Sequence, residues 1–291
     1  MILRFLAAAA ATLAALAPAA AQAPAAPPVQ PVRASKIVLV GDSTTAVIGG
    51  WGPSFCAYHV TSAVACVNLA RGGRSSGSYR AEGSWELALA EMRAAGYRDV
   101  RVLIQFGHND QPGKPGRSTD LATEFPANLR RYVAEARAAG ARPVLVTPLA
   151  RRQFVAGRHQ NDLAPWAEAV RRVAAETGTP LVDLNARSAE AVQALGPALA
   201  ARFAQAAPSP QVAAAALTGT TIPASTGAAP APAASAPSAA QDNAALEPLG
   251  QARLAFDYTH VGRDGADFFA AMVATELARS APGLRPLLVV P

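Results

Sequence analysis

The chain has 291 residues and a net charge of +6, with 16% charged and 51% hydrophobic residues. Such a low charge content excludes a generally disordered, highly charged chain. Much of the hydrophobic content is alanine, and no uncharged run of about 20 strongly apolar residues occurs beyond the N-terminus, which argues against a membrane-spanning protein. Two cysteines are too few for a disulfide-built scaffold or a four-cysteine zinc site.

The N-terminus has the pattern of a targeting segment. A short basic stretch at residues 1–4 is followed by an apolar stretch at 5–17 and a run of alanines at 19–21. This pattern predicts a cleaved signal peptide over residues 1–21 and a flexible leader over 22–35, with a retained N-terminal anchor as the alternative. We therefore expect export to the periplasm or the cell exterior, with no membrane association after cleavage. An oxidising compartment would favour a disulfide between Cys56 and Cys66.

Short apolar runs alternate with amphipathic segments from residue 36 onward. The predicted strands cover residues 36–40, 65–70, 100–106, 143–147 and 180–184, and the predicted helices cover 53–62, 84–95, 126–140, 165–177 and 261–280. Continuous apolar strands that alternate with helices are typical of a parallel sheet covered on both faces. The sequence thus predicts one α/β domain over residues 36–202 and 246–282, followed by a C-terminal tail at 283–291.

Residues 203–245 interrupt this alternation. No charged residue lies between Arg202 and Asp242, and six prolines are scattered among alanine, serine and threonine. Such a segment has little large apolar surface with which to offset the entropy cost of ordering. It is predicted to be a disordered insertion within the single domain.

Polar residues follow three predicted strands and precede the last predicted helix. Ser43 follows the first strand, residues 71–75 the second and Asn109 the third, while Asp257 and His260 lie before the final helix. Ligands of parallel α/β sheets collect at the carboxyl ends of the strands. These residues are therefore expected to form one site.

The residue types at this site are those required for acyl transfer through a serine. His260 would remove the proton of Ser43, and Asp257 would orient and stabilise the imidazole. The backbone N–H groups of Ser43 and Gly73, with the side-chain amide of Asn109, would form an oxyanion hole. Purely structural roles are the alternatives: a helix cap for Ser43 or Asp257, and a turn for Gly73 or Asn109.

Four sequence blocks surround these residues: GDSTT from residue 41, NLARGGRSS from 68, FGHND from 106 and DYTH from 257. Together they resemble the SGNH, or GDSL, hydrolases, and most closely their rhamnogalacturonan and pectin acetylesterase branch. The resemblance implies a flavodoxin-like three-layer α/β/α sandwich with a mostly parallel five-stranded sheet. It implies that Ser43, Asp257 and His260 are catalytic, that Ser43, Gly73 and Asn109 form the oxyanion hole, and that no metal or cofactor is needed.

The predicted function is a secreted serine esterase that removes O-acetyl groups from a rhamnogalacturonan- or pectin-like polysaccharide through an acyl-enzyme. A periplasmic lysophospholipase, thioesterase or arylesterase of the same superfamily, and a non-catalytic saccharide-binding module, are the alternatives. The 24 arginines are scattered without an aromatic-rich basic run, which argues against a nucleic-acid partner. If Arg74 and Arg80, which follow the second block, lie near the mouth of the site, they would attract an acidic chain; for Arg74 the favoured alternative is packing or pairing with a carboxylate. No oligomeric state is predicted.

Overall fold

The computed structural model describes residues 33–227 and 254–291. The predicted signal peptide, most of the predicted leader and residues 228–253 lie outside the described residues. Ser35, the last residue of the predicted leader, already belongs to the first strand.

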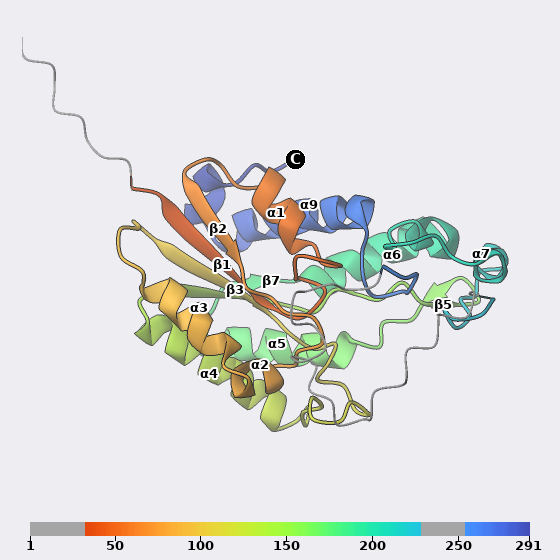
Figure 1. Cartoon of the computed structure of the whole chain (residues 1–291), viewed down its shortest axis with the longest axis horizontal. Coiled ribbons are helices and arrows are strands. Elements are labelled where there is room, and N and C mark those ends of the chain that lie inside the picture. Colours follow the sequence, from red (N-terminus) through yellow and green to blue (C-terminus); the bar gives the residue numbers. More distant parts are fainter. Residues whose placement is uncertain (1–32, 228–253) are drawn as a thin grey trace, which may run out of the picture. The chain divides into compact units, whose positions relative to one another are not determined.

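A parallel sheet of five strands forms the centre of the described domain, in the order β2-β1-β3-β4-β7 (Figure 1). This order is that of the flavodoxin-like sheets, which confirms the predicted fold class. Each predicted strand is present, with the bounds β1 Ser35–Gly41, β2 Val64–Asn68, β3 Val100–Gln105, β4 Arg142–Val146 and β7 Leu181–Val182.

Helices cover both faces of the sheet and complete the three layers (Figure 1). One face is covered by α1 Gly52–Tyr58, α6 Leu184–Ala201, α9 Arg263–Ser280 and the 3-10 helix η1 Pro282–Leu287. The other face is covered by α2 Ser78–Ala81, α3 Ser84–Arg93, α4 Glu124–Ala138 and α5 Ala164–Thr177. The short hairpin of β5 Phe154–Val155 and β6 Arg158–His159 lies outside the main sheet.

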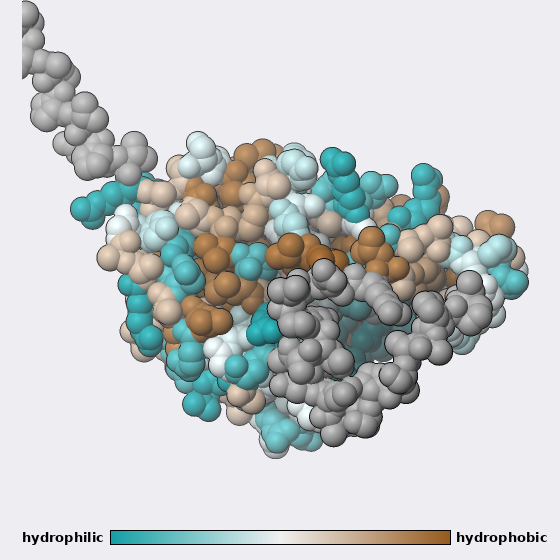
Figure 2. Space-filling view, in the orientation of Figure 1, coloured by the Kyte–Doolittle hydropathy of each residue, from teal (hydrophilic) through white to brown (hydrophobic). Residues whose placement is uncertain are grey.

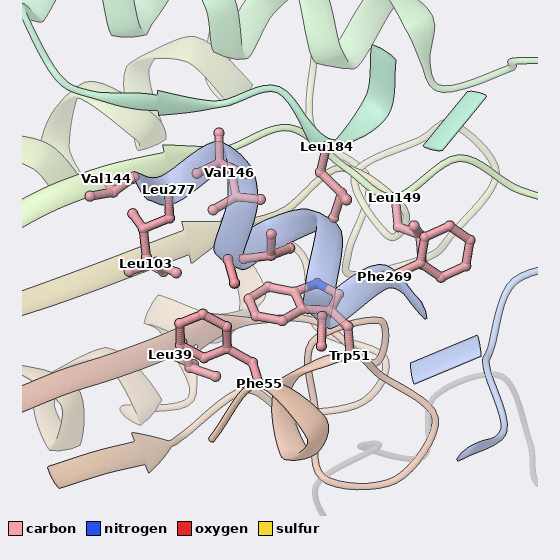
Figure 3. Close-up of a cluster of buried hydrophobic side chains, with 14 of the residues drawn as sticks. Leu39, Trp51, Phe55, Leu103, Val144, Val146, Leu149, Leu184, Phe269 and Leu277 are labelled. Carbon is pink, nitrogen blue, oxygen red and sulfur yellow. The ribbon is translucent and has the colours of Figure 1, made fainter. Parts of the chain in front are cut away.

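Strand β1 shows why both faces need a covering layer. Its side chains alternate, so Leu39 joins one buried cluster and Val38 and Val40 join the other. Figure 3 shows the first cluster, in which Leu39 lies among side chains of α1, β3, β4 and α9. A strand that is apolar on both faces is stable only between two layers, as the continuous apolar run predicts.

The predicted insertion is partly ordered, so the prediction of a disordered segment is wrong for residues 203–227. Helix α7 Pro210–Leu217 begins after Ser209, whose hydroxyl accepts a hydrogen bond from the Val212 N–H (3.2 Å). A serine cap, a proline in the first turn and an alanine-rich body all favour a helix. Phe203 packs against Phe268 and Phe269 of α9, with ring centroids 5.0 and 5.6 Å apart. This part of the segment therefore belongs to the domain.

The predicted C-terminal tail is likewise packed into the fold. Leu284, Leu287 and Leu288 are buried in the same cluster as α9. Leu288 also forms an antiparallel bridge with Val60, next to α1. The leucines cover apolar surface at the end of α9, so the domain extends beyond residue 282.

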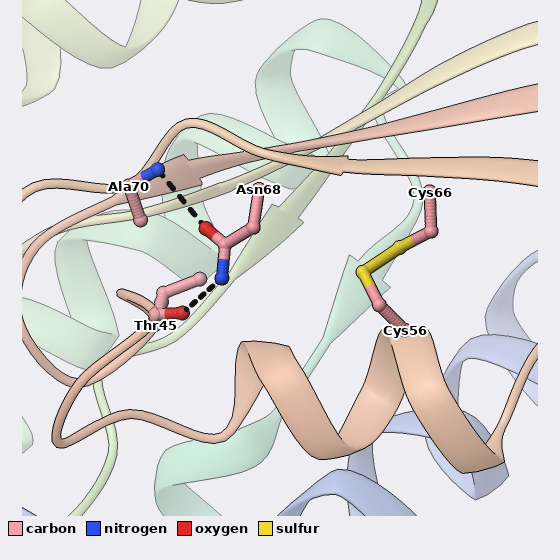
Figure 4. Close-up of a disulfide and its surroundings, with 5 residues drawn as sticks. All are labelled: Thr45, Cys56, Cys66, Asn68 and Ala70. Atoms are coloured by element: carbon pink, nitrogen blue, oxygen red, sulfur yellow. Dashed lines mark hydrogen bonds between the residues drawn. A yellow bond between two sulfur atoms is a disulfide. The ribbon is translucent and has the colours of Figure 1, made fainter.

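A disulfide joins Cys56 of α1 to Cys66 of β2, as predicted, with the two Cα atoms 5.5 Å apart (Figure 4). Two positions further along β2, the Asn68 amide donates a hydrogen bond to the Thr45 carbonyl (2.9 Å). The disulfide and this hydrogen bond both tie β2 to the segment that follows Ser43.

The surface seen in Figure 2 mixes hydrophilic residues with hydrophobic ones. Two of the exposed hydrophobic residues, Val47 and Ile48, lie a few positions after Ser43 and are 64% and 40% exposed. Within residues 33–227 and 254–291, no helix combines the length and apolar character needed to cross a membrane.

Candidate active site

Ser43 lies in a tight turn directly after β1. The buried Asp42 carboxylate accepts hydrogen bonds from the Thr44 N–H (2.9 Å) and hydroxyl (2.7 Å). The Thr44 hydroxyl in turn accepts one from the Gln105 amide (2.5 Å), whose oxygen accepts one from the Trp51 indole (2.9 Å). This buried chain anchors the turn of Ser43 to β3 and to the core.

Ser43, His260 and Asp257 form one hydrogen-bonded chain. The Ser43 hydroxyl lies 2.8 Å from Nε2 of His260, and Nδ1 of the same ring lies 2.7 Å from Oδ2 of Asp257. The other oxygen of Asp257 accepts the backbone N–H groups of Thr259 and His260, both at 2.7 Å. Asp257 therefore caps its turn and orients the imidazole at once. In this arrangement a base can take the serine proton while a carboxylate stabilises the resulting imidazolium.

The environment keeps Asp257 ionised. Burial alone would raise its pKa, but the hydrogen bond and charge of His260, with the two backbone N–H donors, hold the pKa below its usual value. The carboxylate thus keeps its charge at mildly acidic pH, as orientation of a base requires.

The three candidate oxyanion donors lie on three loops at the carboxyl ends of β1, β2 and β3. Among the described residues, the backbone N–H groups of Ser43 and Gly73 have no hydrogen-bond acceptor. The Asn109 amide nitrogen donates one hydrogen to the Arg74 carbonyl (3.1 Å), which leaves its second hydrogen. Gly73 has a φ of +75°, a backbone conformation that glycine adopts more readily than residues with a side chain.

A buried pair joins the loops of Ser43 and Asn109. Oδ2 of Asp42 lies 3.3 Å from Nδ1 of His108, and each residue directly precedes a candidate site residue. Burial lowers the pKa of His108, against the opposing charge of Asp42, and this favours a neutral imidazole at pH 7. The pair therefore fixes the spacing of the two loops, and the sequence alone did not indicate this contact.

Asp110 joins the second and third sequence blocks. Its carboxylate accepts hydrogen bonds from the Ser76 N–H (3.0 Å), the Ser76 hydroxyl (2.6 Å) and the Thr119 hydroxyl (2.9 Å). Burial nevertheless raises its pKa to about 6, because the desolvation of the charge outweighs these donors.

The raised pKa of Asp110 makes the stability of the protein depend on pH. The folded state holds this proton more tightly than the unfolded chain, so the contribution is complete below about pH 4 and is lost as the pH rises through about 6. Relative to an Asp110→Asn variant, the wild type should lose on the order of 3 kcal/mol of unfolding free energy between pH 4 and 7.5. Urea unfolding of both proteins at the two pH values measures this change. An equal difference at both pH values would contradict it.

Arg74 and Arg80 are both paired with carboxylates, so the prediction that they attract an acidic chain at the mouth of the site is wrong, whereas the alternative of carboxylate pairing for Arg74 is confirmed. Arg74 is buried, and its Nε donates to Glu82 (2.8 Å). Arg80 donates to both oxygens of Glu135 at 2.9 Å and lies over the ring of Tyr132. Both guanidinium groups are neutralised by carboxylates inside the fold.

Three other cations approach the candidate site residues instead. The Lys114 ammonium donates to the His108 carbonyl (2.6 Å) and lies 3.5 Å from Oδ1 of Asn109. Arg117 donates to the Gly73 carbonyl (3.4 Å), and Arg151 donates to the Thr259 hydroxyl (3.1 Å). The contacts of Lys114 and Arg117 depend on the course of the loop after β3, and that of Arg151 on the loop after β4, neither of which the sequence revealed.

The charges of these cations are unevenly balanced. Arg151 pairs with Asp162, whereas neither Lys114 nor Arg117 has a carboxylate partner within the part of the chain that the structure describes. Burial, with the charges of Arg151 and Arg117, lowers the pKa of Lys114. The positive potential on this side of the site is therefore only partly neutralised.

The two remaining histidines lie in backbone contacts. Nδ1 of His59 is 2.9 Å from the Val289 carbonyl oxygen, and Nε2 of His159 is 2.6 Å from that of Arg151. In the described ranges, no three His, Cys, Asp or Glu side chains are grouped to hold a metal ion. That the protein needs no metal or cofactor stays a prediction.

A serine, a histidine and an aspartate in one hydrogen-bonded chain, at the carboxyl end of a flavodoxin-like sheet, define the site of an SGNH-type serine hydrolase. Residues 39–202, more than half of the chain, match the GDSL-like lipase/acylhydrolase family. The chain belongs to this family and is an ester hydrolase of the SGNH/GDSL type.

Two relatives from Bacillus subtilis are similar over the catalytic domain. The chain is 36% identical over 162 residues to the probable rhamnogalacturonan acetylesterase YesY, covering 53% of this chain and 72% of that protein. It is 35% identical over 170 residues to the rhamnogalacturonan acetylesterase RhgT, covering 56% of this chain and 70% of that protein.

The fold is similar to that of a solved structure, the protein YxiM from Bacillus subtilis. The TM-score is 0.57 at 23% sequence identity, over 86% of this chain and 58% of that one. At this identity the likeness supports the fold and not the substrate.

Proposed function

We propose that this protein is an exported carbohydrate acetylesterase that removes O-acetyl groups from an acidic, rhamnogalacturonan- or pectin-like polysaccharide. The observation that carries the chemistry is the hydrogen-bonded chain of Ser43, His260 and Asp257. The class of substrate is supported by the two acetylesterase relatives.

The proposed reaction has two acyl-transfer steps. The Ser43 oxygen attacks the acetyl carbonyl while its proton passes to Nε2 of His260, and the N–H groups of Ser43, Gly73 and Asn109 stabilise the oxyanion. The imidazolium then gives its proton to the leaving sugar oxygen, which leaves acetyl-Ser43. Water, deprotonated by His260, attacks this ester and releases acetate while Ser43 regains its proton.

The cations beside the site support an acidic polymer as the substrate. Lys114 and Arg117 contact the loops of Asn109 and Gly73, next to where the acetyl carbonyl would bind. A chain of uronic acids carries a negative charge on each sugar, and such a chain is attracted by a positive potential at the site. A neutral acetylated xylan would gain nothing from these charges.

Export is supported by the disulfide between Cys56 and Cys66, since such bonds persist mainly in oxidising compartments. The predicted signal peptide at residues 1–21 would direct the export of the protein. Cell fractionation, with the intact mass of the recovered protein, tests both the compartment and the cleavage site.

The substrate proposal predicts a salt-dependent reaction. We expect kcat/KM for acetate release from an acetylated pectic polymer to fall markedly between about 10 mM and 500 mM salt, because screening removes the attraction. Hydrolysis of p-nitrophenyl acetate, a small neutral ester, should barely change. Equal rates on acetylated pectin and xylan, with no salt effect on either, would contradict the proposal of an acidic substrate. A preference for dodecanoyl over acetyl esters would contradict the proposal of an acetylesterase.

A matched pair of charge variants locates the effect. Arg117→Gln should lower kcat/KM for the pectic polymer at low salt and weaken its salt dependence. Arg93→Gln removes the same charge from an exposed position at the end of α3, where it should have little effect.

A further inference from the structure

The Arg152 side chain is one of the largest fully buried side chains of the described domain, at 1% exposure. It forms no ion pair with a carboxylate in residues 33–227 or 254–291. Instead its guanidinium donates to the carbonyls of Asp257 (2.9 Å), His260 (2.7 Å) and Thr259 (3.3 Å). The backbone N–H of Arg152 donates to the remaining carbonyl of this stretch, that of Tyr258 (2.9 Å). One residue thus binds four successive carbonyls.

These carbonyls belong to the turn that carries the proposed acid–base pair. The turn has two sides: its N–H groups at Thr259 and His260 point to the Asp257 carboxylate, and its carbonyls point to Arg152. Within the described residues, these four carbonyls accept hydrogen bonds from Arg152 alone. Burying a guanidinium is unfavourable unless its donors are satisfied. The converging carbonyls accept hydrogen bonds from Nη1 and Nη2 of Arg152, while its buried Nε has no acceptor among the described residues.

Arg152 is itself held on a firm support. Two positions before it, the Ala150 N–H donates to the Ser188 hydroxyl (3.1 Å) of α6. Two positions after it, the N–H of the buried Phe154 donates to the Thr221 hydroxyl (2.9 Å). The loop after β4 therefore provides a fixed reference for the turn, which has no strand or helix of its own.

We propose that Arg152 is a positioning residue that holds the turn of Asp257 and His260 in register with Ser43. It does not touch the reacting atoms. It acts by fixing the backbone from which the carboxylate and the imidazole project. The proposal rests on the proposed roles of Ser43, His260 and Asp257.

The test is a double-mutant cycle of Arg152→Met with Asp257→Ala. Methionine keeps much of the apolar volume and removes the guanidinium donors. We expect kcat for p-nitrophenyl acetate to fall about 10²-fold, because small displacements of a catalytic group cost this much, with KM within about threefold. In the Asp257→Ala background the same change should cost less than about tenfold, because Arg152 acts through that pair.

The matched control is Arg101→Met. Arg101 is also buried, at 9% exposure, and donates to Asp99 (2.7 Å) at the start of β3, the end of the sheet away from Ser43. The Arg101→Met variant should have a lower free energy of unfolding than the wild type, with an unchanged kcat per active site. Active sites are counted by titration with a fluorophosphonate, so that misfolded molecules do not enter kcat.

Three results would overturn the proposal: wild-type kcat in Arg152→Met, equal fold losses in both backgrounds, or the same loss in Arg101→Met. If Arg152→Met does not fold, Arg152→Lys keeps the charge with a single ammonium donor, and its kcat should be about tenfold low with the same coupling to Asp257. Full activity of the lysine variant would also overturn it. Failure of the proposed function is distinct, because Ser43→Ala would then remain active.

Discussion

Replacing Ser43 by alanine should abolish ester hydrolysis while leaving the fold intact. Among the described residues, the Ser43 hydroxyl is the only hydroxyl group within hydrogen-bond distance of the His260 ring, at 2.8 Å from Nε2. We expect kcat for p-nitrophenyl acetate to fall by roughly 10⁵–10⁶-fold, and His260→Ala to cost nearly as much, because the members of such a group act as a unit. Circular-dichroism melting of each variant shows whether the fold is kept.

A serine at the other end of the same strand serves as the control. Ser35 is buried at the start of β1, and its hydroxyl has no hydrogen-bond partner in the described part of the chain, so Ser35→Ala should leave kcat unchanged. A fully active Ser43→Ala protein would overturn the assignment of the nucleophile.

The central sheet was predictable because its strands are long apolar runs. Strand β3, which is buried on both faces, contains the uninterrupted apolar run Val102, Leu103 and Ile104, and Gly107 follows its carboxyl end. Short elements were missed for the opposite reason. The hairpin of β5 and β6 has only two residues in each strand, and β6 consists of Arg158 and His159, so no apolar run marks it. Strand β7 is equally short, but its two residues, Leu181 and Val182, are both apolar.

The alanine-rich segment after α6 shows the limit of composition as a guide. Averaged over residues 203–245, the segment resembles a disordered linker, and the local signal of Ser209 and Pro210 is diluted. Its order depends on partners far away in sequence: the Thr221 N–H donates to the Phe154 carbonyl (3.0 Å), and the Tyr258 hydroxyl donates to that of Ile222 (2.6 Å). Such contacts exist only once the domain has folded.

The candidate site was predictable where one residue type performs one recognisable task. Ser43, Asp257 and His260 each lie in a short block whose chemistry can be recognised from its residue types. Arg152 and Lys114 gave no such signal, because arginine and lysine in loops are usually solvated. Their placement follows from the path of two loops, after β3 and after β4.

Replacing Asn109 by alanine should lower kcat by about 10²–10³-fold if its amide is an oxyanion donor. Asn109 is 7% exposed, and its amide is oriented by its hydrogen bond to the Arg74 carbonyl and by the Lys114 ammonium near Oδ1. An oxyanion donor stabilises the transition state more than it stabilises the bound substrate. Its loss should therefore lower kcat and kcat/KM together and change KM little.

A second asparagine separates this role from a structural one. The Asn128 amide donates to the Ser76 hydroxyl (3.1 Å), so it supports the same loop after β2 without reaching the nucleophile's turn. Asn128→Ala should therefore keep kcat within a few-fold of wild type. Steady-state kinetics on p-nitrophenyl acetate compare the two variants. A wild-type kcat in Asn109→Ala would leave the oxyanion to the backbone N–H groups of Ser43 and Gly73, whereas a rise in KM at constant kcat would make Asn109 a binding residue for the ground state.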